Sequence, residues 1–306
     1  MQDSRATPAS LRLKAVLQAV FVTVLWSTSW ILIKFGLRNE IPALTFAGLR
    51  YTFAFLSLLP LVLFSKNQRE AIKAFSPATI ANLGLLGLFY YTLTQGGIFL
   101  SLAYLPAALL NLMLNLTTVV VGLAGVIFLR ELPTRWQWLG VLVVVIGVCI
   151  YFLPLAVPRT QVLGLGVAGF CVLTNAIASL LGRQINRSLA APPLAITFIS
   201  MGFGSILLLI IGLCVQGFQK LAWQDWFIIL WLALINTAFA FTLWNNTLRT
   251  LTAVESSILN SLMMPQVALL AFFFLAENLT LKEIIGLILV GVGVLVVQLR
   301  RKEPDG

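Results

Sequence analysis

Polar and aromatic side chains interrupt the long apolar runs of this chain at helical spacing. Asn111 and Asn115 lie four residues apart, as do Tyr90 and Thr94, and residues at that spacing share one face of a helix. In hydrocarbon, such polar faces must turn toward other protein groups or a water-filled cavity. We therefore expect a cavity whose amide, hydroxyl and aromatic groups bind a small molecule without covalent chemistry.

The residue types that support metal or acid–base catalysis are scarce. The chain has no histidine and ten acidic residues, and no acidic residue falls at the centre of a long apolar run. A membrane-embedded hydrolase needs paired acids or a histidine cluster at membrane depth, so we expect no enzyme activity, no bound metal and no cofactor. Proton-coupled carriers also keep such a group near the midplane. Glu255, near the start of its predicted helix, is the nearest candidate, which favours a carrier driven by the substrate gradient alone.

Composition indicates that the chain is built from membrane-spanning helices. Of 306 residues, 60% are hydrophobic and 10% are charged, whereas about 25% are charged in a typical soluble domain. Runs of this hydropathy are long enough to cross roughly 30 Å of hydrocarbon as helices. We predict an all-α integral membrane protein with ten transmembrane helices at about 15–35, 43–64, 78–100, 106–128, 137–154, 162–182, 193–215, 226–247, 253–275 and 283–299.

The second half of the chain repeats the first. Residues 105–148 align without gaps onto residues 251–294 at a constant offset of 146. Each copy holds five predicted spans, and an odd number turns the second copy upside down in the bilayer. Inverted repeats are typical of transporters, because two near-equivalent halves can exchange conformations around a central site. We expect two inverted-topology repeats at 15–154 and 162–299, flanked by tails at 1–14 and 300–306. The offset superimposes Glu131 on Glu277, Gly140 on Gly286 and Gly147 on Gly293.

The repeat places polar residues at matching positions in both halves. Its offset carries Asn111 and Asn115 onto Ser257 and Ser261. Each polar side chain has an alternative role in an interhelical hydrogen bond, worth about 0.6–2 kcal/mol, but the agreement between the halves favours a shared central cavity. A slightly larger offset matches the first span to the sixth. The predicted substrate-binding lining comprises Trp26, Ser27, Tyr90, Thr94, Asn111, Asn115, Thr174, Asn175, Asn236, Trp244, Ser257 and Ser261.

Two residues inside predicted spans have special backbone or charge properties. Pro265, near the middle of the ninth span, lacks a backbone donor and predicts a kink beside the site, either a gate or a simple bend. Arg50 lies about seven residues into the second span. It can extend toward the interface, pair with backbone carbonyls or line an outer vestibule that attracts carboxylates. Because we find no acidic partner on a neighbouring span, we expect a structural or vestibule role.

The net charge of +10 is explained by membrane topology. With the N-terminus in the cytoplasm, 14 of the 20 Lys and Arg residues fall on the inner side, five on the outer side and Arg50 within a span, which is the positive-inside bias. We expect a multi-pass protein of a bacterial inner (plasma) membrane with both termini cytoplasmic. Its expected partners are the lipid bilayer and a small-molecule substrate, with no nucleic acid and no obligate protein partner.

Each repeat contains a short turn, E-L-P-T from Glu131 or E-N-L-T from Glu277, followed by two glycines seven residues apart. This pattern resembles the EamA domains of the drug/metabolite transporter superfamily, and it covers nearly the whole chain as two tandem domains. Trp26 in the first span and Arg50 in G-L-R-Y-T-F-A-F-L are also similar to that family. The second copy has no arginine at the position equivalent to Arg50. The resemblance implies a ten-helix inner-membrane exporter with both termini inside.

The overall sequence is further similar to YddG-type exporters of aromatic and other amino acids, which implies broad amino acid efflux. A cavity with aromatic walls, amides and hydroxyls suits amino acids with apolar or aromatic side chains, whereas sugar phosphates need two or more basic residues at depth. We expect a secondary transporter that exports amino acids and related metabolites by alternating access. The alternatives are a proton-coupled multidrug or toxic-cation effluxer and, in another class, a membrane receptor or scaffold.

Overall fold

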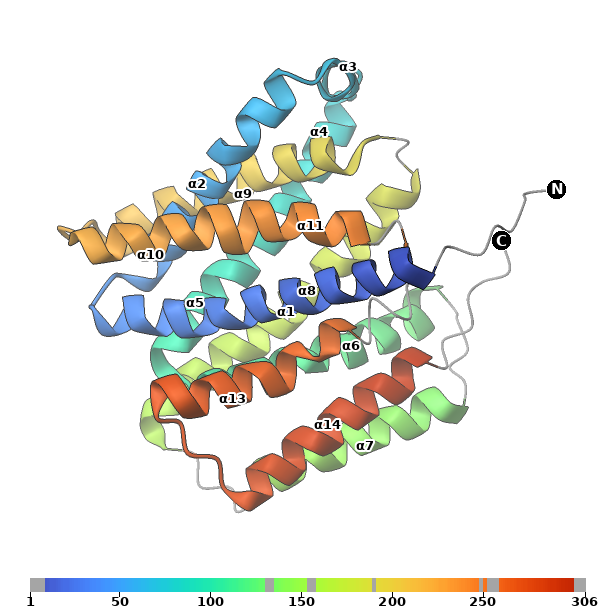
Figure 1. Cartoon of the computed structure of the whole chain (residues 1–306), viewed down its shortest axis with the longest axis vertical. Helices are drawn as coiled ribbons and strands as arrows, with labels where there is room; N and C mark the ends of the chain where they lie inside the picture. The colour runs from blue at the N-terminus through green and yellow to red at the C-terminus, as the bar shows by residue number, and fades with distance from the viewer. Residues whose placement is uncertain are drawn as a thin grey trace.

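A computed structural model describes residues 9–129, 135–152, 158–188, 191–247, 250–251 and 259–299. Within these ranges every regular element is a helix (Figure 1), because a chain in hydrocarbon must satisfy its backbone hydrogen bonds internally. The elements are α1 (Ala9–Arg38), α2 (Ala43–Leu63), α3 (Lys66–Lys73), α4 (Pro77–Gly87), η1 (Leu88–Gln95), α5 (Gly96–Tyr104), α6 (Ala107–Leu129), α7 (Arg135–Phe152), α8 (Arg159–Ser188), α9 (Pro193–Gln216), α10 (Trp223–Ala233), η2 (Leu234–Phe239), α11 (Ala240–Thr247), α13 (Met263–Leu275) and α14 (Leu281–Leu299).

Several of these helices can cross a membrane. In the described part of the chain, six are long and apolar enough by length and composition, and each overlaps a predicted span. Shorter apolar helices at Ala107–Val121, Trp138–Phe152 and Leu259–Leu275 overlap three more. The all-helical membrane architecture is thus confirmed, and the total of ten spans stays a prediction.

Helices α7 and α14, which are equivalent in the two repeats, pack antiparallel. Gly293 approaches Gly140, whereas Gly286 approaches Gly147, so residue numbers rise in opposite directions along the pair. The backbones touch here: a Cβ atom on Gly147 would lie 2.8 Å from the backbone nitrogen of Val290. Small residues permit such close helix crossings in membranes. The glycines that the sequence repeat superimposes therefore meet at one interface.

Helices α2 and α9, also equivalent, show the same arrangement. A Cβ atom on Gly48 would lie 2.5 Å from Cα of Leu209, and one on Gly212 would lie 2.6 Å from the backbone nitrogen of Thr45. Residue numbers again rise in opposite directions. An antiparallel pairing of equivalent helices is the arrangement that inverted repeats produce.

The remaining helices obey the same pseudo-two-fold relationship. Helix α1 packs against α11 and α13, and its equivalent α8 packs against α5 and α6. These partners are themselves equivalent, because α5 and α6 of the first repeat correspond to α11 and α13 of the second. Helices α1 and α8 thus occupy matching places beside the interior of the bundle.

Within the described residues, each repeat contains one π-helical segment, and both lie at the same position of the repeat. The segments η1 and η2 begin 146 residues apart, at Leu88 and Leu234, and such wide turns often occur at functional sites. The hydroxyl of Thr94 donates to the carbonyl of Phe89 at 2.8 Å. The hydroxyl of Thr237 likewise donates to the carbonyl five residues before it, at 2.8 Å. These bonds provide partners for carbonyl groups in the widened turns.

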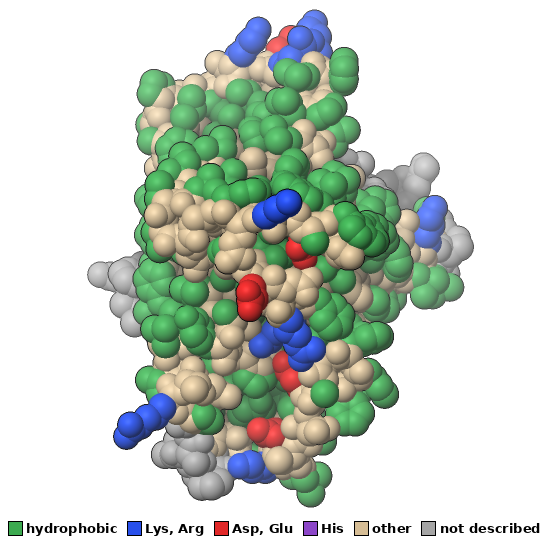
Figure 2. Space-filling model, turned by 90° about the vertical axis from the view of Figure 1, so that its left-hand side faces the viewer, with side chains coloured by type: hydrophobic (Ala, Val, Ile, Leu, Met, Phe, Trp, Pro, Cys, Tyr) green, Lys and Arg blue, Asp and Glu red, His purple; other side chains and the backbone are tan. Residues whose placement is uncertain are grey.

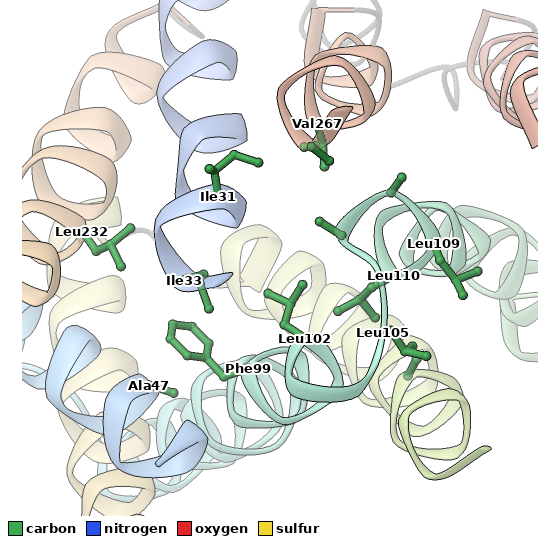
Figure 3. Packing of buried hydrophobic residues seen from close by; sticks show 14 of the residues in the cluster. Ile31, Ile33, Ala47, Phe99, Leu102, Leu105, Leu109, Leu110, Leu232 and Val267 are labelled. Atoms are coloured by element: carbon green, nitrogen blue, oxygen red, sulfur yellow. The ribbon is translucent and has the colours of Figure 1, made fainter. Parts of the chain in front are cut away.

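Apolar packing is concentrated toward the end of the bundle where α1 and α13 finish and α6 begins (Figure 1). Ile33, Phe99, Leu102 and Leu110 point toward one another there from α1, α5 and α6 (Figure 3). Figure 2 views this end from outside and shows acidic and basic side chains among hydrophobic ones. A smaller cluster joins α1 to Leu251 near the other end. The described structure is therefore packed more extensively toward one end than toward the other.

Candidate functional site

Arg50 is buried and has no ion-pair partner among the described residues. Its side chain is 6% exposed. Its Nε and Nη2 atoms each lie 3.2 Å from the hydroxyl of Thr237 on η2. The guanidinium carbon also lies 5.1 Å from the ring centre of Tyr51 and 5.8 Å from that of Phe99. The guanidinium is thus contacted by one hydroxyl and two aromatic rings. From the sequence, we expected it to pair with backbone carbonyls or to line an outer vestibule.

The next residue, Tyr51, reaches the other π-helical segment. Its hydroxyl donates to the side-chain oxygen of Gln95, the last residue of η1, at 2.7 Å. The Tyr51 ring packs 5.6 Å from Tyr91, which in turn lies 4.9 Å from the ring of Tyr90. Two consecutive residues of α2 therefore contact both π-helical segments. Tyr90 of the predicted lining belongs to this aromatic group.

Predicted lining residues on η1 and α8 contact each other directly. The hydroxyls of Thr94 and Thr174 lie 2.9 Å apart in a buried hydrogen bond. One residue further along α8, the side-chain nitrogen of Asn175 donates to the hydroxyl of Thr117 on α6 at 3.4 Å. In this conformation Thr94, Thr174 and Asn175 form hydrogen bonds between neighbouring helices. Such interhelical bonding is the alternative role that the sequence leaves open for each polar side chain.

The predicted residues on α1 make the corresponding contacts in the second repeat. The ring of Trp26 lies 5.2 Å from that of Trp244 and 5.3 Å from that of Phe241, both on α11. The Ser27 hydroxyl donates to the side-chain oxygen of Gln266 on α13 at 2.9 Å. Hence α1 presents an aromatic contact and a polar contact beside the bundle interior.

Asn236 on η2 is completely buried and joins α1. Its side-chain nitrogen lies 3.0 Å from the hydroxyl of Thr28 and 2.9 Å from that of Ser29, and it also contacts the carbonyl of Leu25. Its side-chain oxygen has no partner among the described residues. A buried acceptor without a partner is unusual and calls for an explanation such as a ligand or water.

Asn111 and Asn115 share one face of α6, as their spacing predicts. The Asn115 side-chain nitrogen donates to the Asn111 carbonyl at 2.8 Å and to its side-chain oxygen at 3.1 Å. The side-chain nitrogen of Asn111 is buried and has no partner among the described residues. This face of α6 therefore keeps a donor available.

The remaining predicted residues lie around α13. Ser257 lies outside the described residues, and Ser261 lies just before α13. Because α13 begins at Met263, Pro265 falls in its first turn, where a missing backbone donor breaks no hydrogen bond within the helix. Its role as a gate stays a prediction, as does the assignment of the lining residues.

Gln95, Thr237 and Gln266 are among the contact residues that were not predicted from the sequence. Gln95 and Gln266 are polar residues inside apolar runs, which is a usable signal. Thr237 has no such signal, because threonine is common in membrane helices and its partner Arg50 lies 187 residues away in the sequence. Only the folded structure brings the two together.

The site has the chemistry of a binding site, with hydroxyl, amide and aromatic groups and one guanidinium. Among the described residues, no cluster of His, Cys, Asp or Glu side chains could hold a metal ion. One open groove lies on the start of α1, lined by Leu13, Lys14, Leu17, Gln18 and Phe21. It contains none of the predicted lining residues, so the expected central cavity stays a prediction.

Known proteins share both the sequence pattern and the fold. One solved crystal structure superimposes with a TM-score of 0.62 at 19% identity, covering 94% of this chain and 98% of that one. The uncharacterized transporter YvbV of Bacillus subtilis is 26% identical over 303 residues, which cover 94% of this chain and 93% of that protein. An uncharacterized transporter of Archaeoglobus fulgidus is 26% identical over 297 residues, which cover 94% and 99%. The EamA-like transporter family matches residues 13–153 and again residues 162–299, and the chain belongs to this family of multi-pass membrane transporters.

Proposed function

We propose that this transporter exports amino acids, aromatic and others, together with related small metabolites, by alternating access. The observation that carries the proposal is the matched pair of interfaces around α1 and α8. Ser27 on α1 bonds to α13, and Asn175 on α8 bonds to α6, the helix equivalent to α13. Two equivalent interfaces beside one interior can exchange conformations and open a site to alternate sides.

The side chains near α1 and η1 support amino acids as the substrate class. The rings of Trp26 and Trp244 offer a stacking surface for apolar or aromatic side chains. The unpaired side-chain oxygen of Asn236 is an acceptor for an ammonium group. The resemblance to YddG-type exporters supports the same class.

The proposed energy source is the substrate gradient. The sequence contains no histidine and no acidic residue at the predicted centre of a span, where proton-coupled carriers keep their relay. Glu255, the nearest candidate, lies outside the described residues. The competing function, proton-coupled efflux of drugs or toxic cations, depends on such a relay.

The proposed location is the bacterial inner membrane, with both termini in the cytoplasm. The positive-inside bias of the loops supports this orientation. It would place the end where α1 begins on the cytoplasmic side, and the more extensively packed end where α1 finishes on the outside. Reporter fusions after α14, and in the loop between α1 and α2, would test the orientation.

The test is uptake of radiolabelled phenylalanine into liposomes that contain the purified protein, with and without an imposed proton gradient. The proposal predicts saturable uptake that the gradient does not change. Uptake that requires the gradient would refute the facilitative mechanism and make Glu255 the next residue to replace. Absence of uptake for phenylalanine and for the other amino acids would refute the substrate class.

Tryptophan variants connect the activity to the aromatic contact. We expect Trp26→Ala and Trp244→Ala to raise the KM for phenylalanine about two- to tenfold, because stacking contacts contribute about 0.5–1.5 kcal/mol beyond the buried area. Trp223→Ala is the matched control, since this side chain is 74% exposed at the start of α10. Equal effects of all three substitutions would place the substrate elsewhere.

A further inference from the structure

We infer that Arg50, oriented by Thr237, binds the carboxylate group of the transported substrate. This inference rests on the proposed function and deepens it, because it assigns one residue to one chemical group of an amino acid. A carboxylate is planar and accepts two parallel hydrogen bonds, and the guanidinium fork matches that geometry.

The charge of Arg50 has no countercharge among its described neighbours. An arginine within a membrane span is costly and marks a functional site unless it is paired. Here the described neighbours within hydrogen-bonding or ring-contact distance are Thr237, Tyr51 and Phe99, none of which carries a negative charge. A substrate carboxylate would supply the missing countercharge.

Several N–H donors of Arg50 remain available. A guanidinium has five N–H groups, and in the described structure Nε and Nη2 share one acceptor, the hydroxyl of Thr237. Nη1 has no acceptor among the described residues. Thr237 donates its own hydrogen to the carbonyl of Leu232, so its lone pairs face Arg50 and fix the orientation of the fork. The donors on the side of the guanidinium away from Thr237 would bind the carboxylate.

Arg50 also lies close to both π-helical segments. Arg50 contacts η2, and the adjacent Tyr51 contacts η1, so the guanidinium lies where the two repeats meet. Asn236, next to Thr237 on η2, is buried and keeps an unpaired side-chain oxygen. Arg50 would supply the donor for the carboxylate, and Asn236, which is adjacent to Thr237 in the sequence, would supply an acceptor for the ammonium group of a zwitterion. One guanidinium also suits a single carboxylate better than a phosphate, which carries more charge.

The experiment compares competitors that share one ring and differ at the carboxylate. Uptake of radiolabelled phenylalanine by the full-length protein in liposomes is measured in the presence of unlabelled phenylalanine, phenylalaninamide or 3-phenylpropionate. In the wild type, we expect phenylalaninamide to inhibit uptake about 10–100-fold more weakly than phenylalanine, because the amide loses a charge-assisted hydrogen-bonded pair. Arg50→Gln should reduce that ratio to near one. Arg50→Lys keeps the charge without the fork and should give an intermediate ratio.

The ratio distinguishes substrate recognition from a purely structural role. If Arg50 had only a structural role, Arg50→Gln and Arg50→Lys would change inhibition by phenylalanine and by phenylalaninamide to the same extent. That result would overturn the inference. Equal inhibition by acid and amide in the wild type would overturn it as well. Arg38→Gln is the matched control, because Arg38 is exposed at the end of α1 and donates to the carbonyl of Leu275 at 3.0 Å. Its ratio should equal that of the wild type.

A binding measurement separates this inference from the proposed function. If the wild type transports no amino acid, the proposed function fails, but a carboxylate site is still detectable by protection against thermal unfolding. 3-Phenylpropionate should raise the melting temperature of the purified wild type, 3-phenylpropanamide should not, and Arg50→Lys should reduce the protection. No protection by the acid in a protein that also transports no amino acid would overturn the inference.

Discussion

Ser27 on α1 and Asn175 on α8 occupy matching positions in the two repeats. Ser27 bonds to α13 and Asn175 bonds to α6, and these two partner helices are also equivalent. The bond from Ser27 to Gln266 on α13 is 2.9 Å long, whereas the bond from Asn175 to Thr117 on α6 is 3.4 Å long. The two interfaces are therefore similar in kind, and their hydrogen bonds differ in length. In an alternating-access carrier, equivalent interfaces of this kind differ in the inward-open and outward-open conformations, because a symmetric structure would treat the two sides of the membrane alike.

The glycine contact between α7 and α14 leaves no room for a methyl group. A Cβ atom on Gly147 would lie 2.8 Å from the backbone nitrogen of Val290 and 2.9 Å from the carbonyl oxygen of Gly286. We expect Gly147→Ala to destabilise the protein by about 1–3 kcal/mol, as overpacking does, measured by thermal unfolding in detergent. Gly169→Ala is the control, since nothing lies within 4 Å of its Cβ position. An unchanged melting temperature in Gly147→Ala would contradict the close crossing.

The Thr94 hydroxyl serves both the π-helical turn and the contact with α8. Thr94→Val removes the bonds to the Phe89 carbonyl and to the Thr174 hydroxyl. Because buried polar groups are left without partners, we expect a loss of about 1–3 kcal/mol in unfolding free energy. Thr242→Val is the matched control: Thr242 is exposed on α11 and bonds only to a carbonyl four residues earlier. Equal melting temperatures for the two variants would refute the assigned role.

Glu277 stabilises the start of α6 from the opposite repeat. Its two carboxylate oxygens accept from the backbone N–H groups of Ala107 and Ala108 at 2.9 and 3.3 Å. A carboxylate at a helix N-terminus satisfies unpaired donors and interacts favourably with the helix dipole. We expect Glu277→Ala to cost about 0.5–2 kcal/mol in thermal unfolding experiments. Glu70→Ala, at an exposed ion pair with Lys66, should change stability by no more than about 0.5 kcal/mol.

The apolar packing near the end of α1 should open when substrate is transported. Leu110 is fully buried there, so in a background without reactive cysteines we expect Leu110→Cys to resist a membrane-impermeant maleimide. Addition of a transported substrate should increase its labelling rate, because alternating access exposes this packing. Tyr104→Cys is the control, since Tyr104 is 42% exposed near the same end, and it should be labelled with or without substrate. Labelling of Leu110→Cys that substrate leaves unchanged would contradict the opening.

The helices and their repeat were predictable because hydropathy and residue spacing are local properties. Glycines at the repeat offset were visible in the sequence, and Gly147 and Gly286 do meet in the fold. The π-helical turns were not predictable, because one widened turn leaves the hydropathy of an apolar run unchanged.

The partner of Arg50 could not be predicted for a different reason. Hydropathy places Arg50 inside a span, and its charge identifies it as unusual. The contact with Thr237, however, joins the two repeats across the folded protein, and the pattern of α2 alone contains no information about η2. Asn236 was predicted to line the cavity, but its attachment to α1 depends on tertiary packing.

The matched π-helical turns also carry information about descent. An inserted residue rotates the rest of a helix by about 100° relative to the residues before it. Such an insertion in η1 and another in η2, both at one position of the repeat, would be an improbable coincidence if each arose separately. A single widened turn, already present before the two halves diverged, would account for both. Deleting one residue from either copy would rotate α5 or α11 relative to its present partners.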